Sequence, residues 1–400
     1  MSHLSDSDLF YNNRPINQYL NAKQKKYNSL AKKYLTTQLI EGRCALCLGA
    51  GVGKGVGLPL WSELITGLFC SILVHEPLSR EKRAFLINSD IKSRIGNVSL
   101  FNSINTLESA EYIQLALERY VNIYANDTKL AYNHSTAERM MARDILSTLE
   151  FFRKTSNENN WSVLKSLAKL ITAPDGIRQV LTYNYDDALE YACDNLLSGT
   201  RNYQSCGIRE CTVINSSKEL PSFIYHVHGR LPLFCDYLKK NLQEDINAGI
   251  ILSERSYNHV ESMVYNSTNT CQAQIFQTYS CLFIGFSAQD YNYKRIMKGI
   301  PLSPQDRDNL VNNITEGAEC SRSPHFMIFS LSSFIKELGA GKVKISKTDE
   351  KNYKYLLQKM IDTHFNYYTR YNIWPIYIRS HADTYTVLNR LAHALPSSKG

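Results

Sequence analysis

Four glycine-rich or polar motifs constrain this chain most, because each one directly follows a short apolar or β-branched run. The first is a glycine-rich turn at 49–57, which follows the apolar run 44–48. The others lie at 182–187 (TYNYDD), 226–229 (HVHG) and 285–290 (GFSAQD). In an open parallel sheet, the residues that follow the strands gather at one edge, where ligands bind. The order of the motifs therefore predicts one shared site.

The rest of the chain predicts an α/β fold, a doubly wound Rossmann-like parallel sheet with a large helical insertion and an N-terminal helical arm. We expect the arm at 1–40, the Rossmann domain at 41–400 and the insertion at about 66–175. The clearest helix of the insertion is 107–118, and we expect the insertion to pack over the carboxyl ends of the strands. A last helix at 385–395 would cover one face. The predicted strands are 44–48, 179–182, 223–227, 281–284, 326–329 and 376–378.

The glycine turn matches neither of two well-known phosphate loops. A P-loop needs Gly, four residues, Gly-Lys and then Ser or Thr. Here Lys54 is followed by Gly55, and Leu48 stands where the first glycine belongs. The dinucleotide fingerprint would need a third glycine in place of Lys54. Glycines still allow close approach to a ligand, and the helix predicted to follow would favour a diphosphate at its N-terminus. A turn that serves only the strand-to-helix geometry is the alternative.

Taken together, the motifs resemble those of the sirtuin-like superfamily, and in particular its zinc-less bacterial branch. GAG at 49–51 followed by GLP at 57–59 resembles the NAD-binding turn of that superfamily. The segment 182–186 resembles the motif that carries a catalytic Asn and a ribose-contacting Asp, and 228–229 resembles the catalytic His-Gly motif. The segment 285–287 resembles the loop that closes over the adenosine half of NAD. Further similarity lies at 251–257, 290–292 and 372–377, so the resemblance covers about residues 40–395.

The chain departs from the superfamily at two places. Gly53 stands where sirtuins usually have Ser. The deacylases also carry a CxxC…CxxC zinc module between the catalytic His and the adenosine loop, whereas only Cys235, Cys271 and Cys281 occur in that interval here. Because that module helps to frame the peptide cleft of the deacylases, this second departure argues against protein deacylation.

The resemblance implies an NAD+ hydrolase (NADase) that cleaves NAD+ to nicotinamide and ADP-ribose. It assigns Asn184 to the orientation of water or ribose, His228 to acid–base work and Asp186 to the positioning of the ribose. Trp61 is expected to line the nicotinamide pocket. The cofactor-binding candidates are Gly49, Ala50, Gly51, Gly53, Trp61, Ser287 and Asp290.

These residue types suit that chemistry, because cleavage of the nicotinamide–ribose bond passes through an oxocarbenium-like sugar. The amide of Asn184 can hold a hydroxyl or a water through its donor and its acceptor. His228 can take a proton near neutral pH. On a continued strand, Asp186 would share a side with Asn184 and could offset the developing positive charge. The alternatives are a helix cap or an Asx turn at Asn184 and Asp186, and a helix cap at Ser287. For the histidines they are a structural role for His228 and catalysis by His226, which would point to the same side as His228.

We expect no metal site. Cys44 and Cys47 have CxxC spacing but lie in a predicted strand, where residues three apart face opposite sides. Cys206 and Cys211 lack a partner pair at zinc-ligand spacing. The longest apolar stretch, 65–74, is too short to cross a bilayer, and the start lacks a secretory signal, so we expect a cytoplasmic protein. Much of the net charge of +8 lies in lysine clusters that are typical of solvated helix faces, so direct nucleic-acid binding is not predicted.

An enzyme that depletes NAD+ must be controlled, and the resemblance implies an antiphage effector that acts by abortive infection. We expect control by homo-oligomerisation and by a separate partner protein, with the N-terminal arm or the insertion as the contact surface. The family suggests a HerA-type hexameric ATPase as one partner and an Argonaute-like protein as another. The alternative functions are an NAD-dependent protein deacylase or ADP-ribosyltransferase, and a catalytically silent module that binds NAD or ADP-ribose.

Overall fold

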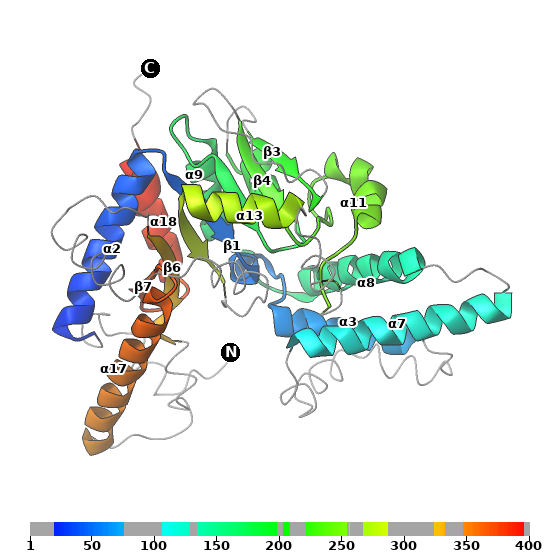
Figure 1. The fold of residues 1–400 in the computed structure, drawn as a ribbon, viewed down its shortest axis with the longest axis horizontal. Helices are drawn as coiled ribbons and strands as arrows, with labels where there is room; N and C mark the ends of the chain where they lie inside the picture. Colours follow the sequence, from blue (N-terminus) through cyan, green and yellow to red (C-terminus); the bar gives the residue numbers. More distant parts are fainter. Residues whose placement is uncertain are drawn as a thin grey trace.

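The protein is built around a seven-stranded parallel sheet with helices on both faces (Figure 1). The computed structural model describes residues 20–75, 106–128, 134–197, 203–208, 221–253, 256, 267–286, 324–332 and 347–395. The strands are β1 (Cys44–Leu48), β2 (Gln179–Thr182), β3 (Tyr203–Cys206), β4 (Ser222–His226), β5 (Ser280–Ile284), β6 (His325–Ser330) and β7 (Ile373–Ile378). All of the predicted strands are therefore confirmed, and so is the Rossmann-like α/β fold.

Strand β3 was not predicted from the sequence. Its four residues include the exposed Gln204 and the half-buried Ser205, so it lacks the apolar run that marks the other strands. It pairs with β4 alone and ends the described sheet on one side. A strand with a single neighbour needs less apolar surface than a central one, which explains why its sequence carries a weak signal.

Strand β1 lies at the point where the chain reverses its direction across the sheet. The strand order is β3-β4-β2-β1-β5-β6-β7, and every neighbouring pair is parallel. From β1 the chain builds β2 and β4 to one side, and then β5, β6 and β7 to the other. Such a topological switch point leaves a crevice outside the carboxyl ends of the strands, where open α/β sheets bind ligands.

The side chains of β1 alternate between two cores. Leu46 packs in a cluster with buried residues of four helices on one face: α2 (Ala22–Ile40), α9 (Ser162–Thr172), α10 (Ala188–Asn195) and α18 (Asp383–Ala394). Cys47 packs in the cluster of the other face, with α13 (Ser267–Thr278). Cys44 belongs to the first cluster, so the prediction that it and Cys47 face opposite sides is confirmed. The last helix, predicted at 385–395, is confirmed as α18.

Helix α2 is the described part of the predicted N-terminal arm, and it closes one edge of the sheet. Its residues Leu35 and Leu39 are buried in the main core. The Asn28 side chain pairs with the backbone of the edge strand β7: Nδ2 donates to the Tyr377 carbonyl at 3.2 Å, and Oδ1 accepts from the Tyr377 N–H at 2.9 Å. A side-chain amide thus supplies the two hydrogen bonds that a further strand would make. Helix α17 (Lys347–Thr369) packs beside α2 against β7.

Three helices of the predicted insertion form a layer at the side of the sheet (Figure 1). They are α3 (Trp61–His75), α7 (Thr106–Thr128) and α8 (His134–Thr155). The helix predicted at 107–118 is confirmed within α7. Helix α9, at the end of the predicted interval, packs against the sheet itself. The remaining short helices are η2 (Ala50–Val52), η3 (Lys54–Val56), η5 (Leu238–Asn241) and α11 (Leu242–Ala248).

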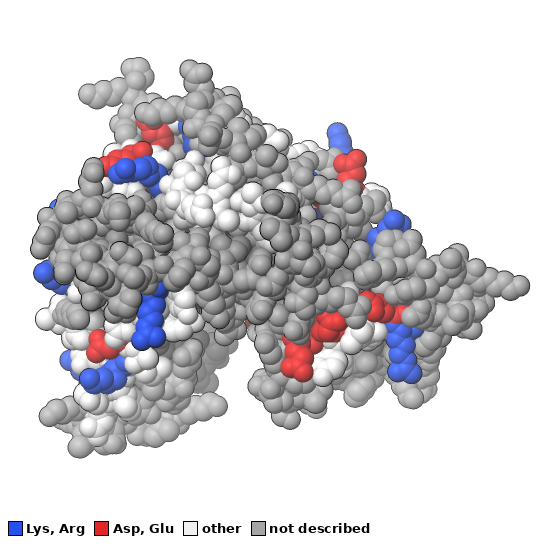
Figure 2. Space-filling model, in the orientation of Figure 1, with Lys and Arg blue, Asp and Glu red and all other residues white. Residues whose placement is uncertain are grey.

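The charged side chains of the described surface are mixed in sign. On the face drawn in Figure 2, Lys and Arg lie among Asp and Glu. Several are paired, as with Lys54 Nζ and Glu63 Oε1 at 2.8 Å and Lys154 Nζ and Glu150 Oε2 at 3.2 Å. None of the helices in the described ranges is both long enough and apolar enough to span a lipid bilayer.

The amide of Asn28 should make a measurable contribution to stability. In Asn28→Ala the buried N–H and carbonyl of Tyr377 lose their partners, so we expect the free energy of unfolding to fall by about 2–4 kcal/mol. Urea unfolding followed by circular dichroism measures it. Ser29→Ala changes the exposed neighbour on the same helix and should cost less than about 0.5 kcal/mol. Equal losses in the two variants would contradict the edge-capping role of Asn28.

Candidate active site

The residues that follow β1, β2, β4 and β5 lie together at the carboxyl edge of the sheet. The strand registers align Leu48 with both Thr182 and Ile284. Thr182 is aligned in turn with His226. The pairing continues beyond the strands, since the Tyr183 N–H donates to the Leu48 carbonyl at 2.9 Å. The predicted gathering of the four motifs at one edge is therefore confirmed for their described residues.

The glycine turn after β1 packs backbone against backbone with the loop after β5. The Gly51 N–H donates to the Gly285 carbonyl at 2.9 Å. A Cβ added at Gly49 would lie 2.6 Å from the Gly285 carbonyl oxygen, and one added at Gly51 would lie 2.7 Å from the Gly285 Cα. Gly285 itself has a φ of 63°, in the left-handed region that favours glycine. Close contact of two strand ends at the switch point therefore requires these three glycines.

Most N–H groups of the turn bond within the chain. Gly49 donates to the Ile284 carbonyl, Val52 to the Gly49 carbonyl, and Gly53 to the Ala50 carbonyl. The N–H of Ala50 has no acceptor among the described residues. At the start of the turn, the Ala50 N–H is therefore available to donate to a ligand, but a row of such donors is not present there. Diphosphate binding by this turn stays a prediction.

Asn184 follows β2, and its side chain reaches the glycine turn. Its Nδ2 donates to the Gly49 carbonyl at 3.3 Å, and its backbone N–H donates to Thr182 Oγ1 at 3.2 Å. Its Oδ1 accepts no hydrogen bond from any described group, although the residue is only 8% exposed. The amide is therefore anchored at its donor end and available at its acceptor end.

Asp186 forms an Asx turn directly before α10, and a helix cap or an Asx turn was the alternative for this residue. Strand β2 ends at Thr182, so the strand alternation does not reach Asn184 and Asp186. Asp186 Oδ1 accepts from the Ala188 N–H at 3.1 Å, at the start of α10. Its second oxygen accepts nothing from the described part of the chain. Burial raises the pKa of Asp186 to about 7, and the neighbouring Asp187 adds to this, against the opposing effect of the Ala188 N–H.

The adjacent Asp187 is a structural carboxylate that sequence reasoning left without a role. It is fully buried and accepts three backbone N–H groups at 2.8 Å, from Leu233, Phe234 and Cys235. It thereby ties the loop after β4 to the start of α10. A second Asp directly before a predicted helix was the available signal, because carboxylates there commonly accept backbone donors.

The two histidines after β4 have different surroundings, so the expectation that they point to one side is wrong. Strand β4 ends at His226, and His228 lies in the following turn. The His228 ring meets the edge of Tyr183 at a centroid distance of 5.0 Å and lies 6.5 Å from the ring of Tyr185. These two tyrosines flank Asn184 in the sequence, so His228 lies beside the Asn184 segment. It is 2% exposed, whereas His226 is fully buried.

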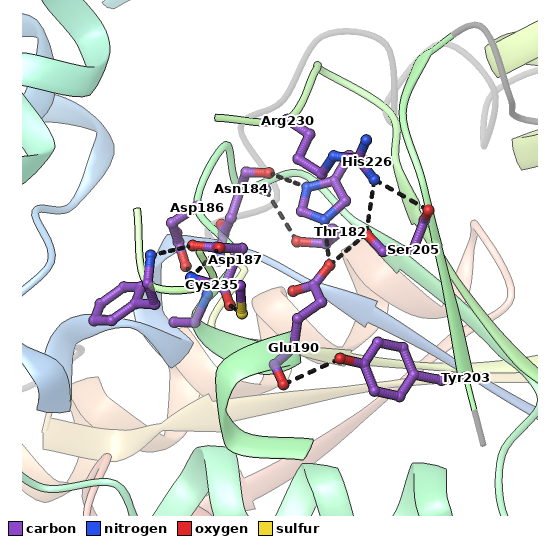
Figure 3. Close-up of polar contacts among 12 residues, drawn as sticks. Thr182, Asn184, Asp186, Asp187, Glu190, Tyr203, Ser205, His226, Arg230 and Cys235 are labelled. Atoms are coloured by element: carbon purple, nitrogen blue, oxygen red, sulfur yellow. Dashed lines mark hydrogen bonds and ion pairs between the residues drawn. The ribbon is translucent and has the colours of Figure 1, made fainter. Parts of the chain in front are cut away.

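His226 belongs to a buried polar network that sequence reasoning missed (Figure 3). Its Nε2 lies 2.7 Å from Glu190 Oε1, and Ser205 Oγ donates to the same oxygen at 2.7 Å. Arg230 donates to the Ser205 carbonyl at 3.0 Å and forms a double hydrogen bond with Asp245 of α11, at 3.0 Å each. The network joins α10, β3, β4 and α11. The weak signal for β3 hid it, because Ser205 lies in that strand.

The pair of His226 and Glu190 shifts the pKa of each group toward its charged form. Burial alone would lower the pKa of His226, but the charge and hydrogen bond of Glu190 outweigh burial and raise it. Burial alone would raise the pKa of Glu190, but His226 outweighs it and the pKa falls. Both directions indicate an ion pair rather than two neutral groups.

The other predicted site residues are placed only in part. Trp61 is half-buried at the start of α3, with its ring centroid 6.4 Å from that of Tyr185. It therefore borders the same strand-end region as His228. Ser287 and Asp290 lie outside the described residues.

The insertion contacts the strand-end region at two points. The Asn160 N–H, after α8, donates to the Gly55 carbonyl of the glycine turn at 2.7 Å. Gln114 of α7 hydrogen-bonds Ser253, in the segment that follows α11. The Ile251 N–H of that segment donates to the His228 carbonyl at 3.0 Å. The insertion is thereby joined to the glycine turn and to the loops around His228.

Within the described ranges, no three His, Cys, Asp or Glu side chains are grouped to hold a metal ion. The cysteines described there are buried free thiols. The expectation of a metal-free site stays a prediction.

Comparison with known proteins identifies a domain around this site. A family model described as a SIR2-like domain matches residues 178–309. The match begins at β2 and includes Asn184, Asp186 and His228, but not the glycine turn. A SIR2-like domain indicates an NAD-using enzyme. A search of curated proteins finds no match to this chain.

The glycine contact can be tested with two alanine substitutions in the same turn. In Gly51→Ala the new Cβ meets the backbone of Gly285, so the strand-end loops must move apart, at a cost of about 1–3 kcal/mol in unfolding free energy. In Gly53→Ala the Cβ meets only the Leu58 side chain, nearest at 2.8 Å, which can shift. Urea unfolding of both variants measures the difference, and a larger loss in Gly53→Ala would contradict the packing role of Gly51.

The raised pKa of Asp186 predicts a pH-dependent stability. The folded state keeps this carboxyl protonated up to pH of about 7, whereas the unfolded chain releases the proton near pH 3.8. Its contribution to stability therefore falls as the pH rises between these values. Asp186→Asn should remove that part of the decline in urea midpoints measured from pH 4 to 8. Asp236→Asn, at an exposed aspartate, should leave the decline unchanged.

Proposed function

We propose that this chain is an NAD+ hydrolase, which cleaves NAD+ to nicotinamide and ADP-ribose with water as the acceptor. The observation that carries the proposal is the amide of Asn184, within the SIR2-like match. Its nitrogen is bonded to Gly49 at the switch point of the sheet, and its oxygen has no partner in the described chain. An acceptor of this kind can hold a ribose hydroxyl or an attacking water in a fixed place.

The proposed reaction divides the work among three side chains. The bond between the nicotinamide nitrogen and ribose C1 breaks, and its electron pair leaves with nicotinamide. A water held at Asn184 Oδ1 attacks C1 and gives its proton to His228. The ionised carboxylate of Asp186 stabilises the positive charge that develops on the sugar and anchors a ribose hydroxyl. The pKa of Asp186, raised to about 7, makes this carboxylate ionised mainly above neutral pH.

The rest of the NAD+ molecule would extend along the strand-end crevice. We assign its diphosphate to the turn that contains Gly49, Ala50, Gly51 and Gly53, where the Ala50 N–H is available. Trp61 would border the nicotinamide end, since it lies near Tyr185. Ser287 and Asp290 stay proposed contacts of the adenosine half.

Hydrolysis is favoured over transfer to a protein, because the interval from His228 to Gly285 lacks the paired CxxC motifs that frame a peptide cleft in the deacylases. We further propose an antiphage effector that depletes NAD+ and is controlled by oligomerisation and a partner, with a HerA-type ATPase as one candidate. Under this proposal the segment 1–40 or the insertion at about 66–175 supplies the contact surface of a Rossmann domain at 41–400.

The test is NAD+ consumption scored by product, for the protein alone and with the product of its neighbouring gene. We expect nicotinamide and ADP-ribose from the wild type, and rates at least about 100-fold lower from Asn184→Ala and His228→Ala, because each removes a group that acts in the transition state. His364→Gln, at a histidine of α17 against β7, should keep the wild-type rate. NAD+ binding without turnover in every assembly would support a silent binding module instead.

A further inference from the structure

We infer that His226 and Glu190 are positioning residues of the candidate site: their buried pair holds the backbone of Asn184 and thereby aims the Asn184 amide. The expected effect on kcat rests on the proposed NAD+ hydrolysis. The expected protonation of His226 and the ordering of the Asn184 segment do not. His226 does not touch a ligand under this inference, since it is fully buried.

The hydrogen bonds of His226 determine where its protons lie. Nδ1 lies 3.2 Å from the Asn184 carbonyl oxygen, and Nε2 lies 2.7 Å from Glu190 Oε1. A carbonyl only accepts, so Nδ1 carries a proton and donates it to Asn184. An ionised carboxylate also only accepts, so Nε2 carries a proton as well. His226 is then an imidazolium whose two N–H groups connect Asn184 to helix α10.

The charged groups that face His226 come from three segments. Glu190 lies on α10, Asp186 precedes that helix, and Arg230 lies in the loop after β4. Arg230 forms a double hydrogen bond with Asp245 and is connected to Glu190 through Ser205. Glu190 is therefore the anion that is hydrogen-bonded to His226.

Besides its backbone N–H bond to Thr182, Asn184 is held at its carbonyl and at its side-chain amide. His226 holds its carbonyl, and the Gly49 carbonyl holds its side-chain nitrogen. Figure 3 shows His226 between Asn184 and Glu190. If the bond from Nδ1 is lost, the Asn184 peptide can rotate, and its free Oδ1 moves with it. A shift of about 1 Å in a positioning group can change a rate about 100-fold.

Two substitutions at His226 separate this role from general stability. In His226→Asn, the side-chain Nδ2 takes the place of the ring Nδ1 and keeps a donor to Asn184. In His226→Gln, the longer side chain reaches toward Glu190 and loses the donor to Asn184. Both remove the imidazolium, so a purely structural role predicts equal effects.

We expect kcat for NAD+ cleavage to be at least about tenfold lower in His226→Gln than in His226→Asn, with KM values within about threefold. The two variants should have similar urea midpoints, and His364→Gln should behave as wild type. Equal kcat values in the two His226 variants would overturn the inference.

Two measurements test the pair without any turnover. Long-range 1H–15N NMR of the histidine-labelled full chain should show both ring nitrogens of His226 protonated at pH 7.5, with the signal assigned by its loss in His226→Gln. Amide hydrogen exchange should be faster in peptides that cover 182–187 in His226→Gln than in His226→Asn. A neutral ring, or equal exchange, contradicts the inference. If the wild type shows the doubly protonated ring and the difference in exchange but does not cleave NAD+, only the proposed function is contradicted.

Discussion

The contact between the glycine turn and Gly285 is the constraint on which the strand-end region depends. Gly49 and Gly51 place backbone against backbone at the reversal point of the sheet, where a Cβ would lie under 3 Å from Gly285. The Gly49 carbonyl, held there, accepts from the Asn184 amide. One close approach therefore fixes both the two strand ends at the switch point and the carbonyl that holds the Asn184 amide.

Two buried carboxylates, Asp187 and Glu190, hold the segments around this region together. Asp187 gathers three backbone donors from the loop after β4, and Glu190 pairs with His226 one turn further along α10. Helix α10 thus carries carboxylates that bind the neighbouring segments at its start. Removing one partner of such a pair leaves an uncompensated charge, which costs more than the pair itself contributes. The arrangement favours one conformation of the segment at 182–187.

The sequence predicted every described strand except β3, and their common edge, because apolar runs and the motifs after them are local signals. The sequence could not predict the buried polar network, because His226, Glu190 and Ser205 meet only after β3, β4 and α10 pack together. The same limit affected the histidines: strand alternation suggested one side for His226 and His228, but β4 ends between them. A boundary of one residue thus placed His226 in the strand, bonded to Glu190 and the Asn184 carbonyl, and His228 in the turn beside Tyr183.

The end of β4 between the two histidines gives them different surroundings. Glu190 raises the pKa of the enclosed His226 ring by stabilising the imidazolium, and an imidazolium cannot accept a proton from water. His228 lies in the turn after β4, where its ring packs against that of Tyr183 and lies near that of Tyr185. Acid–base chemistry therefore suits His228 better than His226. Under the proposed function the two histidines would serve one site, with the ring of His226 bonded to the Asn184 carbonyl and that of His228 beside the tyrosines that flank Asn184.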